Sequence, residues 1–228
     1  MADQGNYAHI KGKLKSIEKS ESKGGNKYLS VSVDCRSPKH GTVVAYCNVF
    51  NLKAVEQFLE TFEKGMEVYL KGSLNQYMGP KSNKLGTSFN VFAGEEWSKE
   101  DDQHNYYRAT FVVIGELTEV KDDDGEKTLK VKVTTEGKDD TVYSNNLELN
   151  LPSETEMSFG TDLTAGSVYK FVGALQRDED SYGETIRRLR PVVKRIEVTK
   201  DGESDNTTPD SLPPSAEPTQ GGLDDIPF

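Results

Sequence analysis

Several aromatic and basic residues among the first hundred positions have the spacing to bind a chain of unstacked nucleic-acid bases. Such bases stack on flat aromatic rings, each worth about 1–3 kcal/mol, and their phosphates need nearby cations. Because duplex DNA exposes no base faces, an aromatic surface favours single strands. The candidate stacking residues are Tyr28, Tyr46, Phe50, Tyr69 and Tyr77, and the candidate phosphate contacts are Lys27, Lys71, Lys81 and Lys84. The alternative for any one of these tyrosines is packing against a strand loop or a second subunit.

The sequence offers no set of residues typical of an enzyme. The three histidines are far apart in the sequence, which also lacks a phosphate-binding glycine loop and a nucleophile elbow. Cys35 and Cys47 are expected on adjacent strands facing a core, where cysteine behaves as a small apolar residue. The acidic run at 122–125 lacks the alternating spacing of a calcium loop. We therefore predict a protein that is not an enzyme and that holds no cofactor or metal.

The net charge of −10 is unevenly distributed along the 228 residues. Residues 1–98 contain 13 Lys and Arg against 10 Asp and Glu, residues 99–200 contain 15 against 21, and residues 201–228 contain none against 7. The acidity belongs to the second half and the tail, so the overall charge does not exclude a nucleic-acid partner. The tail is also too poor in apolar side chains to offset its ordering entropy, which predicts disorder.

Neither a membrane span nor a secretion signal is indicated by the sequence. No run approaches the roughly 20 apolar residues of a membrane helix. The N-terminus, MADQGNYAHIKGK, lacks the basic-then-apolar order of a signal peptide. These observations predict a cytoplasmic location and no membrane partner.

Apolar and polar residues alternate with a period of two through most of the first half, which predicts strands. The five stretches are 7–17, 27–35, 42–50, 66–77 and 87–92. Residues 52–65 instead have apolar positions at helical spacing and end at Gly65, a common helix stop. Three strands, a helix and two strands follow one another in an OB-fold, a small five-stranded barrel.

The second half of the chain repeats the first. IKGKLKSI at 10–17 resembles VIGELTEV at 113–120, and GMEVYLKGSLN at 65–75 resembles GSVYKFVGALQ at 166–176. The two offsets, 103 and 101 residues, agree as expected for a duplicated domain. Further strands are expected at 127–134, 141–151 and 188–198, with a loop or single turn at 153–166 in place of the helix.

We therefore predict a mainly β protein made of two tandem OB-fold barrels. The first barrel would comprise residues 1–98 and contain the main binding surface. A polar linker at 99–105 would join it to the second barrel at 106–200, and residues 201–228 would form the disordered acidic tail.

The second repeat departs from the first at the candidate binding residues. Lys170 and Val172 stand where Tyr69 and Lys71 stand in the first repeat. The basic residues of the second repeat concentrate near its end, at Arg187, Arg188, Arg190, Lys194 and Arg195. Three roles for this basic patch stay open, namely extending a DNA path, docking the acidic tail and contacting a partner protein.

Three stretches of the chain resemble the single-stranded DNA-binding protein (SSB) family of bacteria and their phages. VEQFLETFEKGMEVYLKGSLNQY at 55–77 is similar to the family's helix and following strand. VVAYCNVFN at 43–51 places Phe50 at the family's aromatic position that ends the third strand. The terminal DDIPF resembles the family's C-terminal interaction tip nearly residue for residue.

The resemblance implies a protein that coats single-stranded DNA without sequence preference during replication, recombination and repair. It implies that partner enzymes of these processes bind the tip residues Asp224, Asp225, Ile226, Pro227 and Phe228. Typical members assemble four barrels, so the resemblance implies that a two-barrel chain forms a homodimer or is a phage variant working as a monomer or dimer. The tryptophans common on the family's DNA-binding face are absent, and the single tryptophan, Trp97, is expected at the exit of the barrel, so tyrosines would have to substitute. The competing hypothesis is an adaptor or decoy that displays the tip while its barrels bind proteins and no DNA.

Overall fold

Strands make up nearly all of the described structure, which confirms the prediction of a mainly β protein. The computed structural model describes residues 4–22, 24–37, 41–50, 52–78, 85–97, 107–123, 126–136, 141–152, 155–157, 163–177 and 189–199. The strands are β1 (Gly5–Glu21), β2 (Lys27–Ser37), β3 (Gly41–Val49), β4 (Glu67–Met78), β5 (Leu85–Glu96), β6 (Arg108–Asp123), β7 (Glu126–Glu136), β8 (Val142–Leu151), β9 (Glu156–Met157), β10 (Val168–Arg177) and β11 (Leu189–Val198). The helix is α1 (Leu52–Thr61). Within these residues, no helix has the length and apolar character needed to span a membrane.

Strands β1 to β5 close into a ring that we call the first barrel. β1 pairs with β2 and β4, β3 pairs with β2 and β5, and β4 pairs with β5. The helix α1 lies between β3 and β4 and buries Phe58, whose ring centroid is 4.7 Å from that of Phe62, the buried residue that follows the helix. It ends at Thr61, and the chain turns at Gly65 with a φ of 97°. This order of strands and helix confirms the predicted OB-fold.

Strands β6 to β11 close in the same order and are called the second barrel here. β6 pairs with β7 and β10, β8 pairs with β7 and β11, and β10 pairs with β11. The segment predicted as a loop or turn at 153–166 contains the two-residue strand β9, which pairs with β11. Residues 98–106 and 200–228 lie outside the described residues, so the predicted linker, tail and domain limits stay predictions.

Backbone details of the two barrels recur at the offsets found in the sequence. Gly65 and Gly166 both have a positive φ, of 97° and 88°. Their N–H groups donate to the carbonyls of Leu14 and Leu117 at 2.8 and 2.7 Å. A register shift follows Lys71 where β4 pairs with β5, and another follows the equivalent residue where β10 pairs with β11. The two halves therefore share backbone geometry as well as strand order.

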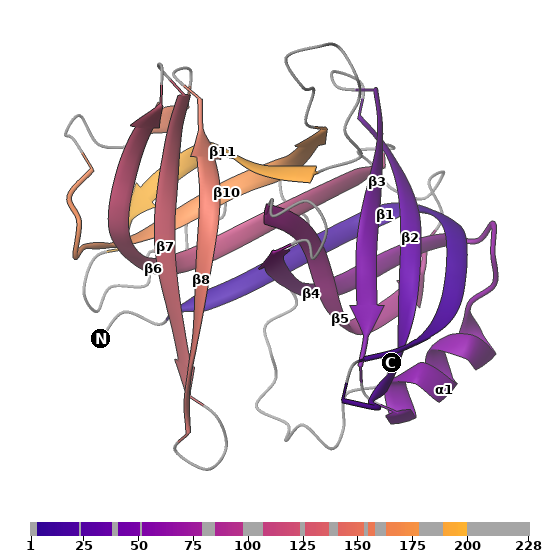
Figure 1. Ribbon diagram of the computed structural model, residues 1–228. Helices are drawn as coiled ribbons and strands as arrows, with labels where there is room; N and C mark the ends of the chain where they lie inside the picture. The colour runs from indigo at the N-terminus through magenta and orange to yellow at the C-terminus, as the bar shows by residue number, and fades with distance from the viewer. Residues whose placement is uncertain are drawn as a thin grey trace.

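The two barrels are joined by the pairing of β1 with β6. Seven residue pairs connect these strands, from Gly5 opposite Ile114 to Lys11 opposite Arg108. Figure 1 shows β1 and β6 running side by side between the barrels. Gly5 corresponds to Arg108 at the repeat offset of 103, and Arg108 pairs with Lys11; Lys11 corresponds to Ile114, which pairs with Gly5. The pairing is therefore symmetric about the pair Ala8 and Phe111, and an approximate twofold axis at this pair relates the two barrels.

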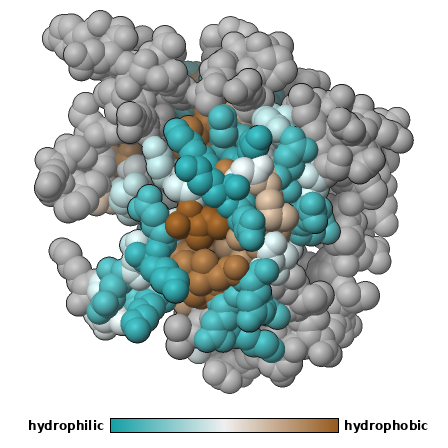
Figure 2. All heavy atoms as spheres, turned by 90° about the vertical axis from the view of Figure 1, so that its right-hand side faces the viewer, coloured by the Kyte–Doolittle hydropathy of each residue, from teal (hydrophilic) through white to brown (hydrophobic). Residues whose placement is uncertain are grey.

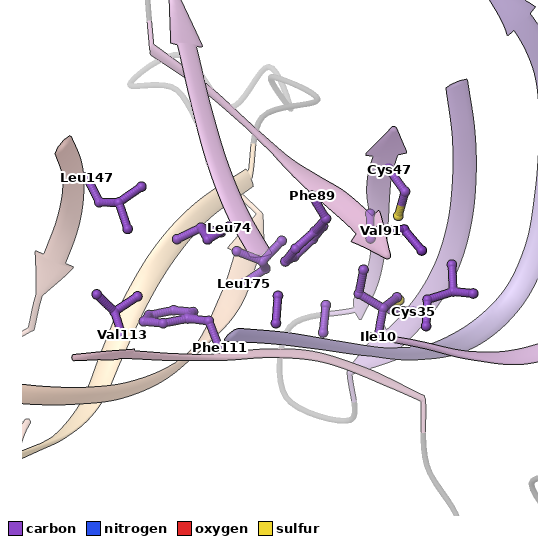
Figure 3. Close-up of a cluster of buried hydrophobic side chains, with 14 of the residues drawn as sticks. Ile10, Cys35, Cys47, Leu74, Phe89, Val91, Phe111, Val113, Leu147 and Leu175 are labelled. Carbon is purple, nitrogen blue, oxygen red and sulfur yellow. The ribbon is translucent and has the colours of Figure 1, made fainter. Parts of the chain in front are cut away.

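A single hydrophobic cluster runs through both barrels. Paired residues on neighbouring strands point to the same side of a sheet, and the described core residues of both barrels, except Val192, belong to one cluster. Figure 3 shows side chains such as Ile10 and Phe89 of the first barrel leading to Phe111 and Leu147 of the second. The pairing of β1 with β6 therefore fuses two cores into one.

Gly72→Ala and Gly173→Ala test the close approach that recurs in both barrels. The added methyl carbon would lie 2.3 Å from the carbonyl oxygen of Asn90 in the first barrel and of Val192 in the second. We expect each variant to lose about 1–3 kcal/mol in the free energy of unfolding, because the backbone must shift. Urea denaturation measures the loss. Gly24→Ala, where the nearest atom is 3.9 Å away, is the control and should unfold as the unchanged protein does. Equal stability of all three variants would contradict the expectation.

Candidate nucleic-acid interface

Three aromatic side chains that we call the aromatic row, Tyr28, Phe50 and Phe92, lie on the outer surface of the first barrel, on or next to β2, β3 and β5. The ring centroids of Tyr28 and Phe50 are 5.2 Å apart, with the planes tilted by 33°. Asn48 of β3 pairs with Asn90 of β5 in a parallel register. The described pairing ends there, and two residues further along each chain are Phe50 and Phe92, whose side chains are each 51% exposed. The row offers exposed aromatic surface of the kind on which bases stack.

Phe92 is absent from the predicted stacking set, although the sequence contains a signal for it. Alternation from the buried Phe89 and Val91 places residue 92 on the outer face of its strand. The register shift between Lys71 and Gly72 leaves Phe92 as the extra residue of a β-bulge. Bulges re-aim a side chain and often lie beside functional sites. Phe92 is thus an exposed aromatic residue of this surface that the predicted stacking set lacked.

Uncharged polar side chains lie between the aromatic row and β4. Ser88 of β5 is 3% exposed, and its hydroxyl oxygen accepts hydrogen bonds from the amides of Asn48 at 3.5 Å and Asn75 at 3.3 Å. These bonds link β3, β5 and β4 and fix the two amides in place. Amides beside stacking rings are suited to hydrogen bonds with the edges of unpaired bases.

The side of the molecule that carries β2 and α1 has an uneven hydropathy. Figure 2 shows a hydrophobic area there within hydrophilic surroundings. The exposed apolar residues of the first barrel include Phe50 and, on α1, Leu59 at 37% exposure. Apolar surface rimmed by polar residues is typical of an interaction site.

Tyr77 lies near the end of β4 and is 49% exposed. A methyl group on Gly86 of β5 would lie 2.8 Å from the Tyr77 ring, so this glycine leaves room for the ring to lie against β5. Lys27 is exposed at the start of β2, next to Tyr28 in the chain. Lys81 and Lys84 lie outside the described residues, and their phosphate contacts stay predictions.

Two of the five predicted stacking residues use ring surface within the protein itself. Tyr46 is partly buried and packs against the hydrophobic core. Tyr69 lies in a separate group with His9, Lys11 and Lys71, which we call the Tyr69 cluster. The Nζ atoms of Lys11 and Lys71 are 5.1 and 4.8 Å from the centre of the Tyr69 ring. The structure therefore does not place Tyr69 and Lys71 in the aromatic row.

The Tyr69 cluster contacts Trp97, which follows β5, and Trp97 in turn contacts Tyr107, which precedes β6. Lys11 is 6% exposed, and its Nζ is also 5.2 Å from the centre of the Trp97 ring. Trp97 packs edge-on against Tyr107 at 5.9 Å, and the Tyr107 hydroxyl donates to Glu67. These contacts hold the end of β5 close to the start of β6, so we assign the cluster a mainly structural role.

His9 is uncharged at neutral pH because of its place in this cluster. Burial lowers the pKa of His9 below 6.5, and the charges of Lys71, Arg108 and Lys11 lower it further. The ring stacks on Tyr69 with centroids 5.8 Å apart, and its Nδ1 lies 2.7 Å from the Tyr69 hydroxyl. A neutral imidazole nitrogen can accept the hydroxyl proton in this hydrogen bond.

The second barrel has no aromatic row at the equivalent described positions. Leu129 pairs with Leu149 just as Leu29 pairs with Val49, which sets an offset of 100 residues for these strands. At this offset, Tyr28, Tyr46 and Phe50 correspond to Thr128, Asn146 and Asn150. The bulge of β11 likewise has Lys194 where β5 has Phe92.

Several cations of the second barrel form ion pairs at its surface. Lys130 is 2.6 Å from Glu119, and this ion pair lowers the pKa of the Glu119 carboxyl. Lys170 is 3.0 Å from Glu197, which also binds Arg195 of the predicted basic patch. Within that patch, Lys194 is exposed and Arg190 is half-buried, whereas Arg187 and Arg188 lie outside the described residues.

The chain is similar to the single-stranded DNA-binding protein of Thermus aquaticus, with 15% identity and a TM-score of 0.57 over 89% of this chain and 97% of that one. A deletion variant of the same Thermus aquaticus protein aligns with 14% identity and a TM-score of 0.56 over 90% of this chain and 100% of that one. No protein-family model matches the sequence, and no curated protein is significantly similar to it. These similarities show that the chain has the fold of the Thermus aquaticus protein.

His9→Gln tests whether the Tyr69 cluster excludes a charged histidine. The pKa of His9 is near 6.5 in the unfolded chain and lower in the folded chain. As the pH falls through 6.5, the unfolded state therefore binds more protons than the folded state. We expect the stability of the unchanged protein to drop over that range and the drop to be smaller in His9→Gln. Thermal unfolding between pH 7.5 and about 5 measures the difference. Identical pH profiles would show that His9 does not contribute.

Proposed function

We propose that the chain binds single-stranded DNA, without sequence preference, on the outer surface of the first barrel. The observation that carries the proposal is the aromatic row of Tyr28, Phe50 and Phe92. Near this row, the Ser88 hydroxyl holds the side-chain amides of Asn48 and Asn75. Stacking accepts any base, since every base has a flat face. Amides that both donate and accept hydrogen bonds add contacts without selecting one base.

The proposal places the strand on one barrel of each chain. The fold shared with the Thermus aquaticus protein, whose name describes single-stranded DNA binding, supports a nucleic-acid ligand. The second barrel has Thr128, Asn146 and Asn150 at the positions of the aromatic residues, and its Lys130 and Lys170 are paired with glutamates. Bases would therefore gain little from contacting the second barrel, which acts in this proposal as a structural partner of the first.

In the cell, this activity would coat and protect single strands that arise in replication, recombination and repair. The acidic tail supports a second part of the proposal, in which the tip residues Asp224 to Phe228 recruit partner enzymes to the coated strand. Pro227 favours an extended backbone at Ile226, which reduces the ordering cost of binding. Phe228 would fill an apolar pocket, and its carboxylate would meet a cation of the partner. A cytoplasmic location and a homodimer are part of the same proposal.

Alanine variants of the aromatic row test the DNA-binding proposal. We expect Tyr28→Ala, Phe50→Ala and Phe92→Ala each to weaken binding to a labelled poly(dT) oligonucleotide by about 1–3 kcal/mol, because each removes one stacking partner. Fluorescence anisotropy measures the affinity. Thr128→Ala and Asn150→Ala, at the equivalent positions of the second barrel, are the matched controls and should leave the affinity unchanged.

Two outcomes would contradict the DNA-binding proposal. One is equal affinity for poly(dT) and for a duplex of the same length, since a duplex offers no base faces. The other is no binding to either form, combined with capture of partner enzymes by the tail, which would instead support the adaptor or decoy hypothesis.

Removing residues 201–228 tests the role of the tail. Seven carboxylates and no cations lie in this segment, so they compete with DNA phosphates for basic residues when screening is weak. We expect the truncated chain to bind poly(dT) more tightly at low salt, with the difference vanishing at high salt, and to lose recruitment of partner enzymes. Deleting Phe228 alone is the control, because it should abolish recruitment while leaving DNA affinity unchanged. A truncation that altered neither property would reduce the tail to a solubilising segment.

A further inference from the structure

The first half of β8 forms an open strand edge within the part of the chain that the structure describes. β8 pairs with β7 along its length, but with β11 only at Asn150. Figure 1 shows the β7–β8 hairpin extending beyond the rest of the second barrel. Residues 142–146 therefore lie along one side of a protruding arm, with no described strand beside them.

The hydrogen bonds of β7 and β8 show which backbone groups of β8 point towards this edge. The amide of Gln76 bonds both the N–H and the carbonyl of Glu148, at 2.7 and 2.8 Å. Opposite Glu148, the carbonyl of Lys130 accepts from the Thr118 hydroxyl at 3.0 Å, on the far side of β7. The backbone groups of Glu148 and Lys130 thus point away from each other, as in a pair without hydrogen bonds between the strands.

The same alternation applies further along the hairpin. The N–H of Thr134, which lies opposite Ser144, donates to Gln4 at 2.6 Å and so also points away from β8. Pairs of this kind recur every second residue in an antiparallel ladder. The N–H and carbonyl groups of Val142, Ser144 and Asn146 therefore point outward at the open edge. At the next such residue, Glu148, the side-chain amide of Gln76 forms the hydrogen bonds to the outward N–H and carbonyl that a neighbouring strand would otherwise form.

This edge lacks the features that usually prevent strand pairing between molecules. The sequence TVYSNNL at 141–147 contains no charge, lysine or proline, and its ladder with β7 has no bulge. Val142 and Tyr143 are 62% and 61% exposed. The residue of the first barrel that corresponds to Tyr143 is Val43, which is 3% exposed. The second barrel thus exposes a large side chain at a position that its duplicate buries.

We propose that residues 142–146 pair antiparallel with the same residues of a second copy of the chain, across a twofold axis at Ser144. The two hairpins would then form one four-stranded sheet, with Val142 opposite Asn146 of the partner chain and the two Ser144 residues opposite each other. The symmetry of the edge favours a second copy as the occupant, because the outward residues Val142, Ser144 and Asn146 are spaced evenly about Ser144 and match their own counterparts across a twofold axis. Chains of net charge −10 repel one another over most of their surface, whereas this uncharged segment brings no like charges together. An acidic peptide would find no cation on the strand itself.

Five paired residues on each side make a small interface compared with the roughly 1,200–2,000 Å² of a stable complex. The association should therefore be weak between free molecules. On a shared DNA strand, tethering would raise the local concentration and join neighbouring molecules. That consequence rests on the proposed DNA binding, but the strand pairing itself does not.

A cysteine at position 144 tests the pairing directly in the full-length chain without DNA. Residues that exchange backbone hydrogen bonds across an antiparallel pair have Cα atoms about 5.5 Å apart, within disulfide reach. Cys35 and Cys47 are buried, and burial raises the pKa of both thiols, so the new thiol is the reactive one. Under mild oxidation we expect Ser144→Cys to form covalent dimers about tenfold faster or more than the control Thr61→Cys, which places a thiol on exposed α1.

Ser144→Pro supplies the complementary loss-of-function test. Proline removes an outward N–H that β7 does not use, so the hairpin should still form, and thermal unfolding checks that it does. Sedimentation of concentrated protein should show self-association in the unchanged chain that is about tenfold weaker or more in Ser144→Pro. The proposal is overturned if Ser144→Cys cross-links no faster than Thr61→Cys, or if a folded Ser144→Pro variant associates as strongly as the unchanged chain.

Discussion

The backbone pairing between β1 and β6 is the constraint on which the rest of the structure depends. Its seven residue pairs join the two barrels along an approximate twofold axis and place Ala8 and Phe111 on the same side of the sheet. Both residues then enter the shared core, so neither barrel has a complete interior without the other. Because β1 also pairs with β4, any shift in this ladder would displace the Tyr69 cluster and the outer face of β4. The aromatic row is more independent of the junction, since Tyr28, Phe50 and Phe92 lie on or beside β2, β3 and β5.

The two barrels share the glycines that their backbone conformation requires but differ in the residues on their outer surfaces. The close approach at Gly72 and Gly173 and the positive φ of Gly65 and Gly166 recur, because a side chain there would collide or be strained. The outward residues face no such limit. Thr128 and Asn150 could replace Tyr28 and Phe50 without disturbing the core. A two-barrel chain of this kind can therefore specialise one barrel for a ligand while the other keeps the fold together.

Much of the fold could be predicted from the sequence, because strand alternation, the helix and the repeat offset are local patterns. The positions of β1 to β5 and α1 follow from them closely, and Gly65 marks the turn after α1. The two-residue strand β9 could not be predicted, since it exists only through its pairing with β11. For the candidate site, alternation predicts which residues point outward but not how far their rings are free. Tyr69 points outward and is covered by Lys11, Lys71 and His9, a contact set by the pairing of β4 with β1.

The described surface favours stacking over charge as the main source of affinity in the proposed function. Lys71 lies 3.4 Å from Glu95, and Lys11 is buried between Tyr69 and Trp97, so neither is well placed to neutralise phosphates. Lys27 is the exposed cation next to the aromatic row in the chain. Stacking energy is far less sensitive to salt than phosphate contacts, which release counterions. In the proposed function, a chain with a net charge of −10 would therefore hold a polyanion, because most of the binding free energy would come from base stacking and little from contacts with the phosphates, which the acidic residues repel.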